Sequence, residues 1–298
     1  MLTIFSVPKP FHGHIGVIQN NAIRSWISLR PACEVILFGN EEGTAEIASE
    51  LGIQHIAEVE CNEYGTPLLN SMFCIAQDIA KYQLICYVNS DIILMSDFLQ
   101  AIQRLDRHLF LLVGQRWDLE LNELVKFDDN KWESRLRRQV ANKGKLHPKG
   151  GIDYFVFPRG LYKNIPPFAI GRTAWDNWFV YKARSLSVPV IDATKAITAI
   201  HQNHGYSYPI GKTYIWKGPE VERNRELIGG KDHAFTMDYA TFLLTPQKLK
   251  RALTMRHLYF QMMAMPVLHP QFHFLNRPMK LLTKLIIYIR SISGIVKN

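Results

Sequence analysis

Short apolar runs alternate with amphipathic helical segments in the first third of this chain. The runs predict strands, because each is only a few residues long and most end at Pro, Gly or Asn. They lie at 2–7, 34–38, 53–59, 84–88 and 109–113. The run at 84–88 is almost entirely apolar, as expected of a central parallel strand covered on both faces. The pattern predicts an α/β fold with a Rossmann-type, mostly parallel sheet flanked by helices.

The remaining sequence is less regular. Residues 117–150 are charged, polar and poor in periodicity, which predicts a mobile or solvent-facing excursion. Strands are expected beyond it at 152–157, 188–191 and 196–201, and helices at 175–185, 222–262 and 279–296. We therefore expect three parts, at 1–115, 116–220 and 221–298, the last of them a helical C-terminal extension.

Thirty-five Lys and Arg against 26 Asp and Glu give a net charge of +9, and the surplus lies in the second half. Such a charge suits nucleic acid, nucleotide phosphates or an anionic membrane, and does not choose among them. The four cysteines form no CxxC pair, which favours a reducing compartment. The N-terminus lacks the basic region of a signal peptide, and no apolar run approaches the ~20 residues of a membrane span. The sequence predicts a cytoplasmic protein.

The tail that contains the helix expected at 279–296 carries apolar residues on one side and Lys280, Lys284, Arg290 and Lys297 around the other. This pattern is typical of an anchor that lies in a membrane interface. Packing on the protein's own core is the alternative and stays open. An anionic inner membrane surface is therefore kept as a partner, with peripheral attachment of the protein.

The strand at 84–88 runs into Asn89-Ser90-Asp91, where a carboxylate can hold a hard divalent cation by its oxygen. An ordinary turn at a strand end is the alternative. The segment from Val88 to Leu94 resembles the DxD-type segment of GT-A-fold glycosyltransferases, in particular the compact family-2-like enzymes. In that family an apolar strand delivers carboxylates to the metal and to the diphosphate of the sugar nucleotide. Here Asn89 replaces the first acid, so it can hydrogen-bond the ribose or a metal-bound water but brings no charge.

The resemblance implies a GT-A-like fold and an activity. Residues 1–115 would be the nucleotide-sugar-binding half, and 116–220 the acceptor-side, catalytic half of the same domain. The reaction would be metal-dependent transfer of a sugar from a nucleotide-sugar donor, a UDP-sugar, to a hydroxyl of a glycan or lipid-linked acceptor, with inversion.

Two acidic residues could serve as the general base that such a transfer needs. Asp176 lies between Trp175 and Trp178 at a predicted helix start, and matches by position the base of inverting GT-A enzymes. The alternative is a carboxylate that only complements the helix dipole. Asp153 is the rival, and we expect it to bind a sugar or acceptor hydroxyl.

His201 and His204 follow the strand expected at 196–201, in the order in which the family returns a histidine to the metal. Imidazole can complete the coordination of Mn²⁺, which accepts mixed oxygen and nitrogen ligands better than Mg²⁺ does. The strand period does not decide between the two. We predict His201 with Asp91 as ligands of Mn²⁺ (or Mg²⁺), because His201 directly follows the strand.

The other donor-binding residues are predicted from position. Strand ends on the same rim as Asp91 place Val7, Pro8, Asn40 and Glu41 at the uracil and ribose. Further candidates are Thr66 and Asn70 in the first turns of the next helix, Asn89, Ser90 and Asp153, and Arg116 for the diphosphate. Glu220 and Asn224 are polar residues to which no role is assigned.

Two other functions are alternatives for a chain of this pattern and charge. A sugar-nucleotide nucleotidyltransferase would share the α/β half, but it needs a Gly-rich, Arg-bearing loop after the first strand, and the segment from Pro8 to His12 offers none. A non-enzymatic nucleic-acid-binding protein would explain the charge but not the buried strand into Asp91. The chain has no recognition motif of the usual nucleic-acid-binding folds, so nucleic acid is not expected as a partner.

Overall fold

The computed structural model describes residues 1–204 and 216–275. The chain divides into two compact units, Met1–Arg251 and Ala252–Asn298, and each is described by itself. The finer boundaries expected at residues 115 and 220 stay predictions.

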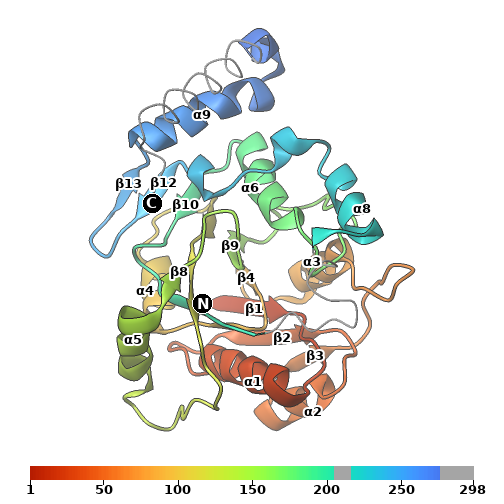
Figure 1. The fold of residues 1–298 in the computed structure, drawn as a ribbon, viewed down its shortest axis with the longest axis vertical. Coiled ribbons are helices and arrows are strands. Elements are labelled where there is room, and N and C mark those ends of the chain that lie inside the picture. The colour runs from red at the N-terminus through yellow and green to blue at the C-terminus, as the bar shows by residue number, and fades with distance from the viewer. Residues whose placement is uncertain (205–215, 276–298) are drawn as a thin grey trace. The chain divides into compact units, whose positions relative to one another are not determined.

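Nine strands of the described chain form one sheet in the first unit, in the order β13-β12-β10-β6-β9-β4-β1-β2-β3 (Figure 1). Their bounds are β1 (Leu2–Ser6), β2 (Glu34–Phe38), β3 (Gln54–Ile56), β4 (Leu84–Val88), β6 (Leu111–Val113), β9 (Tyr154–Pro158), β10 (Val190–Asp192), β12 (Phe242–Leu244) and β13 (Leu249–Arg251). Only β9 and β13 run antiparallel to their neighbours in this sheet. The predicted α/β fold with a mostly parallel sheet is confirmed.

The strand directions bring several chain segments to one rim. The parallel strands β1, β2 and β4 end side by side, since Phe5 pairs with both Ile36 and Tyr87. The antiparallel β9 starts at this rim, because its first residue Tyr154 pairs with Val88, the last residue of β4. Asp153, just before β9, therefore lies beside Asn89, and the Asn89 amide N–H donates to the Asp153 carbonyl at 2.9 Å.

Helices cover both faces of the sheet. Their bounds are α1 (Gly13–Ile27), α2 (Thr44–Leu51), α3 (Leu69–Ile79), α4 (Ser96–Gln103), α6 (Trp175–Ser185) and α8 (Pro219–Leu227). Successive residues of a strand face opposite sides, so β1 packs Ile4 into an aliphatic cluster and Phe5 against Phe73 of α3, with ring centroids 5.0 Å apart. Figure 1 shows α1 and α2 beside β1 and β2.

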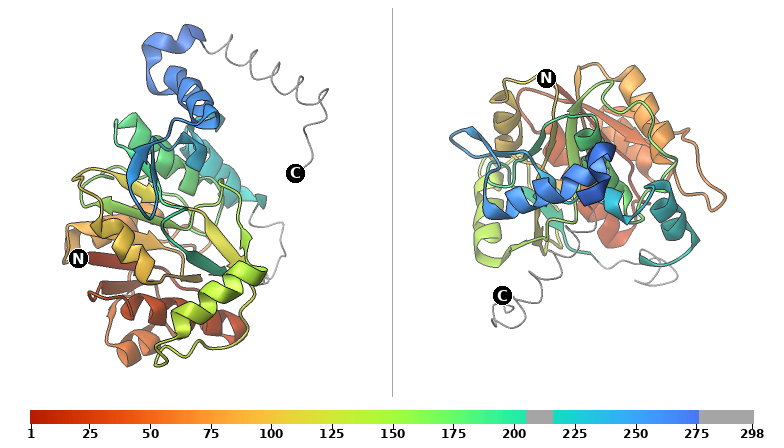
Figure 2. Two further views of the ribbon diagram at one scale, coloured as in Figure 1. Left: turned by 90° about the vertical axis from the view of Figure 1, so that its left-hand side faces the viewer. Right: turned by 90° about the horizontal axis from the view of Figure 1, so that it is seen from above.

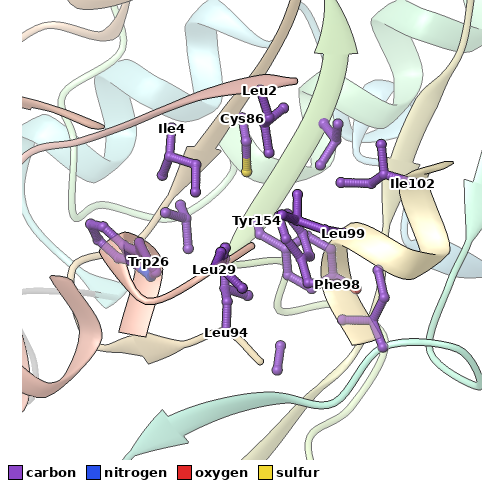
Figure 3. Close-up of a cluster of buried hydrophobic side chains, with 14 of the residues drawn as sticks. Leu2, Ile4, Trp26, Leu29, Cys86, Leu94, Phe98, Leu99, Ile102 and Tyr154 are labelled. Carbon is purple, nitrogen blue, oxygen red and sulfur yellow. The ribbon is translucent and has the colours of Figure 1, made fainter. Parts of the chain in front are cut away.

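The aliphatic cluster draws on α1, α4 and the middle of the sheet (Figure 3). Trp26 of α1 is fully buried there, and its indole N–H donates to the Ile92 carbonyl at 2.9 Å. Phe98 of α4 meets Tyr154 edge to face, with ring centroids 5.9 Å apart. These contacts fix the segment that follows β4, which carries Asp91.

The expectation of a solvent-facing excursion over 117–150 is wrong. This region holds β7 (Arg116–Leu119), α5 (Trp132–Lys143) and β8 (Lys145–Leu146). With β5 (Ile92–Ile93) and β11 (Ala199–Gln202) the two strands form a second sheet, in the order β5-β11-β7-β8. The helix α5 covers it (Figure 2), because its residues at four-residue spacing, Trp132, Leu136 and Val140, are buried with Ile93 and Ile200. Charged residues surround these three positions in the sequence, so the helical spacing of the apolar residues is difficult to detect there.

The helical expectation over 222–262 is also wrong in its middle. After α8 the chain forms short 3-10 turns, η1 (Lys231–His233) and η2 (Met237–Tyr239), and then β12 and β13. β12 pairs with β10 and so extends the main sheet, and hydrogen bonds between Thr245 and Lys248 close the turn to β13. Three-residue strands are too short to show a period in the sequence.

The described part of the second unit contains α9 (Met255–Leu268) and η3 (Pro270–Leu275). The helix predicted at 279–296 lies outside the described residues. Among the helices of the described residues, none has the length and apolar character that crossing a bilayer requires.

Candidate functional site

Asp91, His201 and His204 converge at the rim of the sheet. Asp91 lies beyond the end of β4, and His201 lies in β11, where it pairs with Ile92 of β5 and Asp118 of β7. His204 Nε2 is 3.1 Å from Asp91 Oδ2, and His201 Nε2 is 3.5 Å from the same oxygen. One ligand atom from each residue can be chosen so that all three lie within 4.8 Å of one another. The sequence singled out His201 alone, whereas the structure brings both histidines to Asp91.

The charges of this group suit a cation. Burial opposes ionisation of Asp91, but the neighbouring imidazoles of His201 and His204 hold its pKa well below its usual range. Burial likewise opposes protonation of His201, yet Asp91 and Asp118 raise its pKa to about 9. Asp91 Oδ1 is buried and accepts no hydrogen bond within the described part of the chain. An anionic oxygen with free lone pairs beside two imidazoles fits a divalent ion that accepts oxygen and nitrogen ligands.

Asp118 contacts His201 at the ring nitrogen that does not face Asp91. Its Oδ1 lies 3.4 Å from Nδ1 of His201, while Nε2 of the same ring faces Asp91. A carboxylate behind a ligating histidine fixes the ring orientation and leaves the other nitrogen for the metal. Asp118 also contacts Nδ1 of His147 at 2.8 Å and accepts from Arg116 Nε at 3.0 Å. These partners hold the pKa of Asp118 below its usual range against the effect of burial.

Asp118 and His147 are not among the residues predicted from the sequence. Arg116 and Asp118 stand two residues apart, which places them on one face of a strand, and this alternation was the signal available. His147 follows β8, which pairs with β7, and its amide N–H donates to the Arg116 carbonyl at 2.9 Å. Such a pairing between strands cannot be read from local sequence.

A second polar group adjoins the first through Arg116. Its Nη1 donates to Asp153 Oδ1 at 2.6 Å, and Asn89 Nδ2 donates to the same oxygen at 2.7 Å. Tyr87 in turn donates to Asn89 Oδ1 at 2.8 Å. Arg116 is buried between Asp118 and Asp153, so carboxylates of the protein balance its charge. Its predicted contact with a diphosphate stays a prediction.

Asp176 lies in the first turn of α6, close to Asp153. Its carboxylate accepts hydrogen bonds from the backbone N–H groups of Ile152 and Asn177. Burial nevertheless raises its pKa to about 7, and the charge of Asp153 adds to the increase. A carboxyl group with this pKa can take up a proton near neutral pH.

The predicted donor-binding residues fall into two sets. Val7, Pro8, Asn40 and Glu41 follow the ends of β1 and β2 on the rim, and Asn40 and Glu41 are exposed. Ser90 is buried, and its hydroxyl donates to Gln19 Oε1 at 3.0 Å.

Thr66 and Asn70 form the second set. The prediction that Thr66 opens a helix is wrong, because α3 starts at Leu69, and Leu68 is instead bridged to Ala169. Thr66 hydrogen-bonds Glu220. Asn70 lines an open hollow of about 900 Å³ between α3 and the segment 159–166, with none of the Asp91 group in its lining.

Asp118→Asn is expected to weaken Mn²⁺ binding about 10- to 100-fold, the usual effect of removing a partner of a metal-ligating histidine. Isothermal titration of the protein with Mn²⁺ measures this without any turnover. Asp129→Asn is the matched control, since Asp129 is an exposed partner of Arg135 just before α5. Equal affinities in Asp118→Asn and wild type would show that Asp118 does not support the histidine.

The chain matches neither a protein-family model nor a curated protein sequence. The solved structures to which it is similar include three with bound nucleotide or nucleotide sugar. S. aureus TarS 1-349 in complex with UDP-GlcNAc is 16% identical over 74% of this chain and 61% of that one, with a TM-score of 0.45. GalNAc-T7 with UDP, GalNAc and Mn²⁺ is 12% identical over 77% and 48%, with a TM-score of 0.49.

The mannosyltransferase PcManGT from Pyrobaculum calidifontis, in complex with GDP-Man and Mn²⁺, is 10% identical over 76% of this chain and 68% of that one, with a TM-score of 0.45. All three are GT-A-type glycosyltransferases. The chain spans 48–68% of their lengths. At these identities and TM-scores the function has to be argued from the site itself.

Proposed function

We propose that the protein is a glycosyltransferase that moves a sugar from a nucleotide-sugar donor, a UDP-sugar, to an acceptor hydroxyl with inversion. The observation that carries this proposal is the pairing of two groups on one rim. One is the cation-suited group of Asp91, His201 and His204, and the other holds Asp176, a carboxylate whose pKa is raised to about 7. Transfer from a nucleotide sugar needs both a counter-charge for the departing diphosphate and a base for the acceptor.

Asp91, His201 and His204 would hold the metal. Two imidazoles favour Mn²⁺ over Mg²⁺, which prefers oxygen ligands throughout. When bound, the ion would act as a Lewis acid that neutralises charge on the diphosphate. Where Asn89 replaces the first acid of the motif, one carboxylate and two imidazoles remain as candidate ligands.

The donor would lie along the rim. Val7, Pro8, Asn40 and Glu41 are proposed for the base and ribose, together with Ser90 and Asn89. Asp153 Oδ2 is buried and accepts no hydrogen bond among the described residues, so it is free to accept one from a sugar hydroxyl. Arg116 holds Asp153 in place through its other oxygen, at 2.6 Å.

Asp176 would accept the proton of the acceptor hydroxyl as that oxygen attacks the anomeric carbon. Its backbone hydrogen bonds to Ile152 and Asn177 hold the carboxylate, and burial keeps it basic near neutral pH. A base on the acceptor side is what an inverting transfer requires.

The test is a panel of UDP-, GDP- and dTDP-sugars with Mn²⁺ or with EDTA, in which nucleotide release is measured. We expect release from a UDP-sugar with Mn²⁺ and none with EDTA. Pyrophosphate release from UTP and a sugar 1-phosphate would instead favour a nucleotidyltransferase. Retention on DNA without any nucleotide-sugar binding would favour a nucleic-acid-binding protein.

We further propose a glycan or lipid-linked acceptor and a cytoplasmic protein that attaches to the inner membrane face through its basic C-terminal segment. Each Lys or Arg near an anionic surface contributes about 1 kcal/mol. The full-length chain should sediment with anionic vesicles and not with neutral ones, whereas a chain stopped after Arg277 should stay in solution. If full-length protein and truncated chain both stay in solution, there is no membrane attachment.

A further inference from the structure

Glu220 and Asn224 are buried polar residues that the proposed reaction does not use. They stand four residues apart on α8 and so share one face of that helix. Both face the segment 169–173, which leads into α6 and therefore into Asp176. Buried polar groups of this kind are held by specific partners, and those partners show what the helix face does.

Glu220 binds Arg172. Its Oε2 accepts hydrogen bonds from Arg172 Nε at 2.9 Å and Nη2 at 2.6 Å, and its Oε1 accepts from Asn62 Nδ2 at 2.7 Å. The side chains of Arg172 and Glu220 are 5% and 2% exposed. Loss of either charge would break a two-point salt bridge between buried side chains, so this pair is a strong constraint on the position of Arg172.

Asn224 holds the backbone of the same segment at two points. Its Oδ1 accepts from the Ala169 amide at 2.9 Å, and its Nδ2 donates to the Ala169 carbonyl at 3.0 Å and to the Thr173 carbonyl at 3.4 Å. These hydrogen bonds add to the backbone bridge between Ala169 and Leu68. Together the two residues of α8 fix the segment at Ala169, Arg172 and Thr173.

Ala174 comes next and adopts a strained conformation. Its φ is 92°, and among the described residues the only other non-glycine with positive φ is Ser187. A residue with a Cβ keeps such a conformation only where its surroundings enforce it. Ala174 is the N-cap of α6, and its carbonyl accepts from the Trp178 amide at 3.1 Å. Its backbone therefore sets the direction in which α6 begins, two residues before Asp176.

We propose that Glu220, Arg172 and Asn224 are positioning residues for Asp176. They hold 169–173 so that Ala174 keeps its positive φ and the Asp176 carboxylate stays beside Ile152 and Asp153. This inference rests on the proposed function, in which Asp176 is the base. The partners of Glu220 and Asn224 lie at least 48 residues away in sequence, which is why the sequence alone assigns these two residues no role.

Glu220→Gln keeps the shape of the side chain and removes its charge. We expect kcat to fall about 10- to 100-fold with the donor KM changed less than about twofold, because displacement of a reacting group by about 1 Å has effects of this size. Arg223→Gln is the matched control on the same helix. Arg223 pairs with Glu63 on the surface, with side chains 47% and 60% exposed, and its loss should leave kcat unchanged. Arg172→Lys keeps the buried positive charge but loses the two-point hydrogen bonding of the guanidinium to Glu220. It is the replacement variant if Glu220→Gln does not fold.

A second substitution separates positioning from a merely structural role. Ala174→Gly removes the Cβ, so positive φ no longer needs to be enforced. We expect this change alone to raise the unfolding midpoint by about 2–4 °C. In the Ala174→Gly background, Glu220→Gln should lower kcat by at most about a tenth of the factor by which it lowers kcat in the wild-type background. Equal losses in the two backgrounds would overturn the proposal.

The carboxyl pKa of Asp176, followed by ¹³C NMR, gives a readout that needs no turnover. It should be about 7 in the wild type, fall toward the ordinary aspartate value in Glu220→Gln, and return in the double variant. If the protein transfers no sugar but the pKa follows this course, the proposed function fails and the positioning stands. If sugar is transferred and the pKa is the same in all variants, the positioning is wrong.

Discussion

Asp91→Asn is expected to lower Mn²⁺-dependent nucleotide release by about 10³-fold or more while the protein stays folded, because a bound metal supplies several kcal/mol of charge stabilisation. Asp91 is the sole anionic member of its group, and both histidines point at its Oδ2. Asparagine keeps the shape but leaves two imidazoles with no charged ligand between them. Asp91 lies at the rim and contributes little to packing, so circular dichroism and the cooperativity of thermal unfolding should be retained.

The rate of UDP release as a function of Mn²⁺ concentration measures this effect, with Asp129→Asn as the control. A rate close to wild type in Asp91→Asn would show that Asp91 does not hold a metal ion that the reaction needs. His201→Ala and His204→Ala extend the test, and since both rings contact the same oxygen, each should weaken Mn²⁺ binding. An effect of His204→Ala alone would show that the choice of His201 from the sequence was mistaken.

Asp176→Asn is expected to lower kcat by about 10² to 10⁴, the usual range for loss of a general base, with donor affinity unchanged. The base must be ionised to accept a proton, and burial raises the pKa of Asp176 to about 7. The rate should therefore fall as the pH drops below about 7 and level off above it. Asp176→Asn should lose this acidic limb of the profile.

Donor affinity is followed by titration with UDP in the presence of Mn²⁺. An equal loss of UDP binding in Asp176→Asn would indicate a structural role for the carboxylate. A product with retained anomeric configuration would exclude Asp176 as the base even if the variant were inactive.

The parts of the site that could be predicted are those with a local signal. Asp91 follows the most apolar strand, and Asp176 follows a tryptophan at a helix start, so the sequence around each residue predicts its place at a strand or helix end. Asp153 is also predicted as a site residue from the sequence, although its proximity to Asn89 depends on β9 running antiparallel to β4. Neighbouring apolar runs do not show in which direction a strand runs.

The parts that were missed depend on contacts between distant segments. The choice between His201 and His204 depends on how β11 pairs with β5 and β7, and the sequence contains no trace of that register. Asp118 and His147 lie in a region whose strands have four and two residues, too short for a period to emerge.

The proposed function depends on a metal ion held by Asp91, His201 and His204, at which a nucleotide diphosphate binds. Anomalous scattering from crystals of the full chain with Mn²⁺ and UDP tests it most directly. We expect one manganese peak in contact with an oxygen of Asp91 and a nitrogen of both histidines, with the UDP diphosphate on its open side. UDP bound on the rim with no manganese at Asp91, or manganese bound only at other residues, would contradict it.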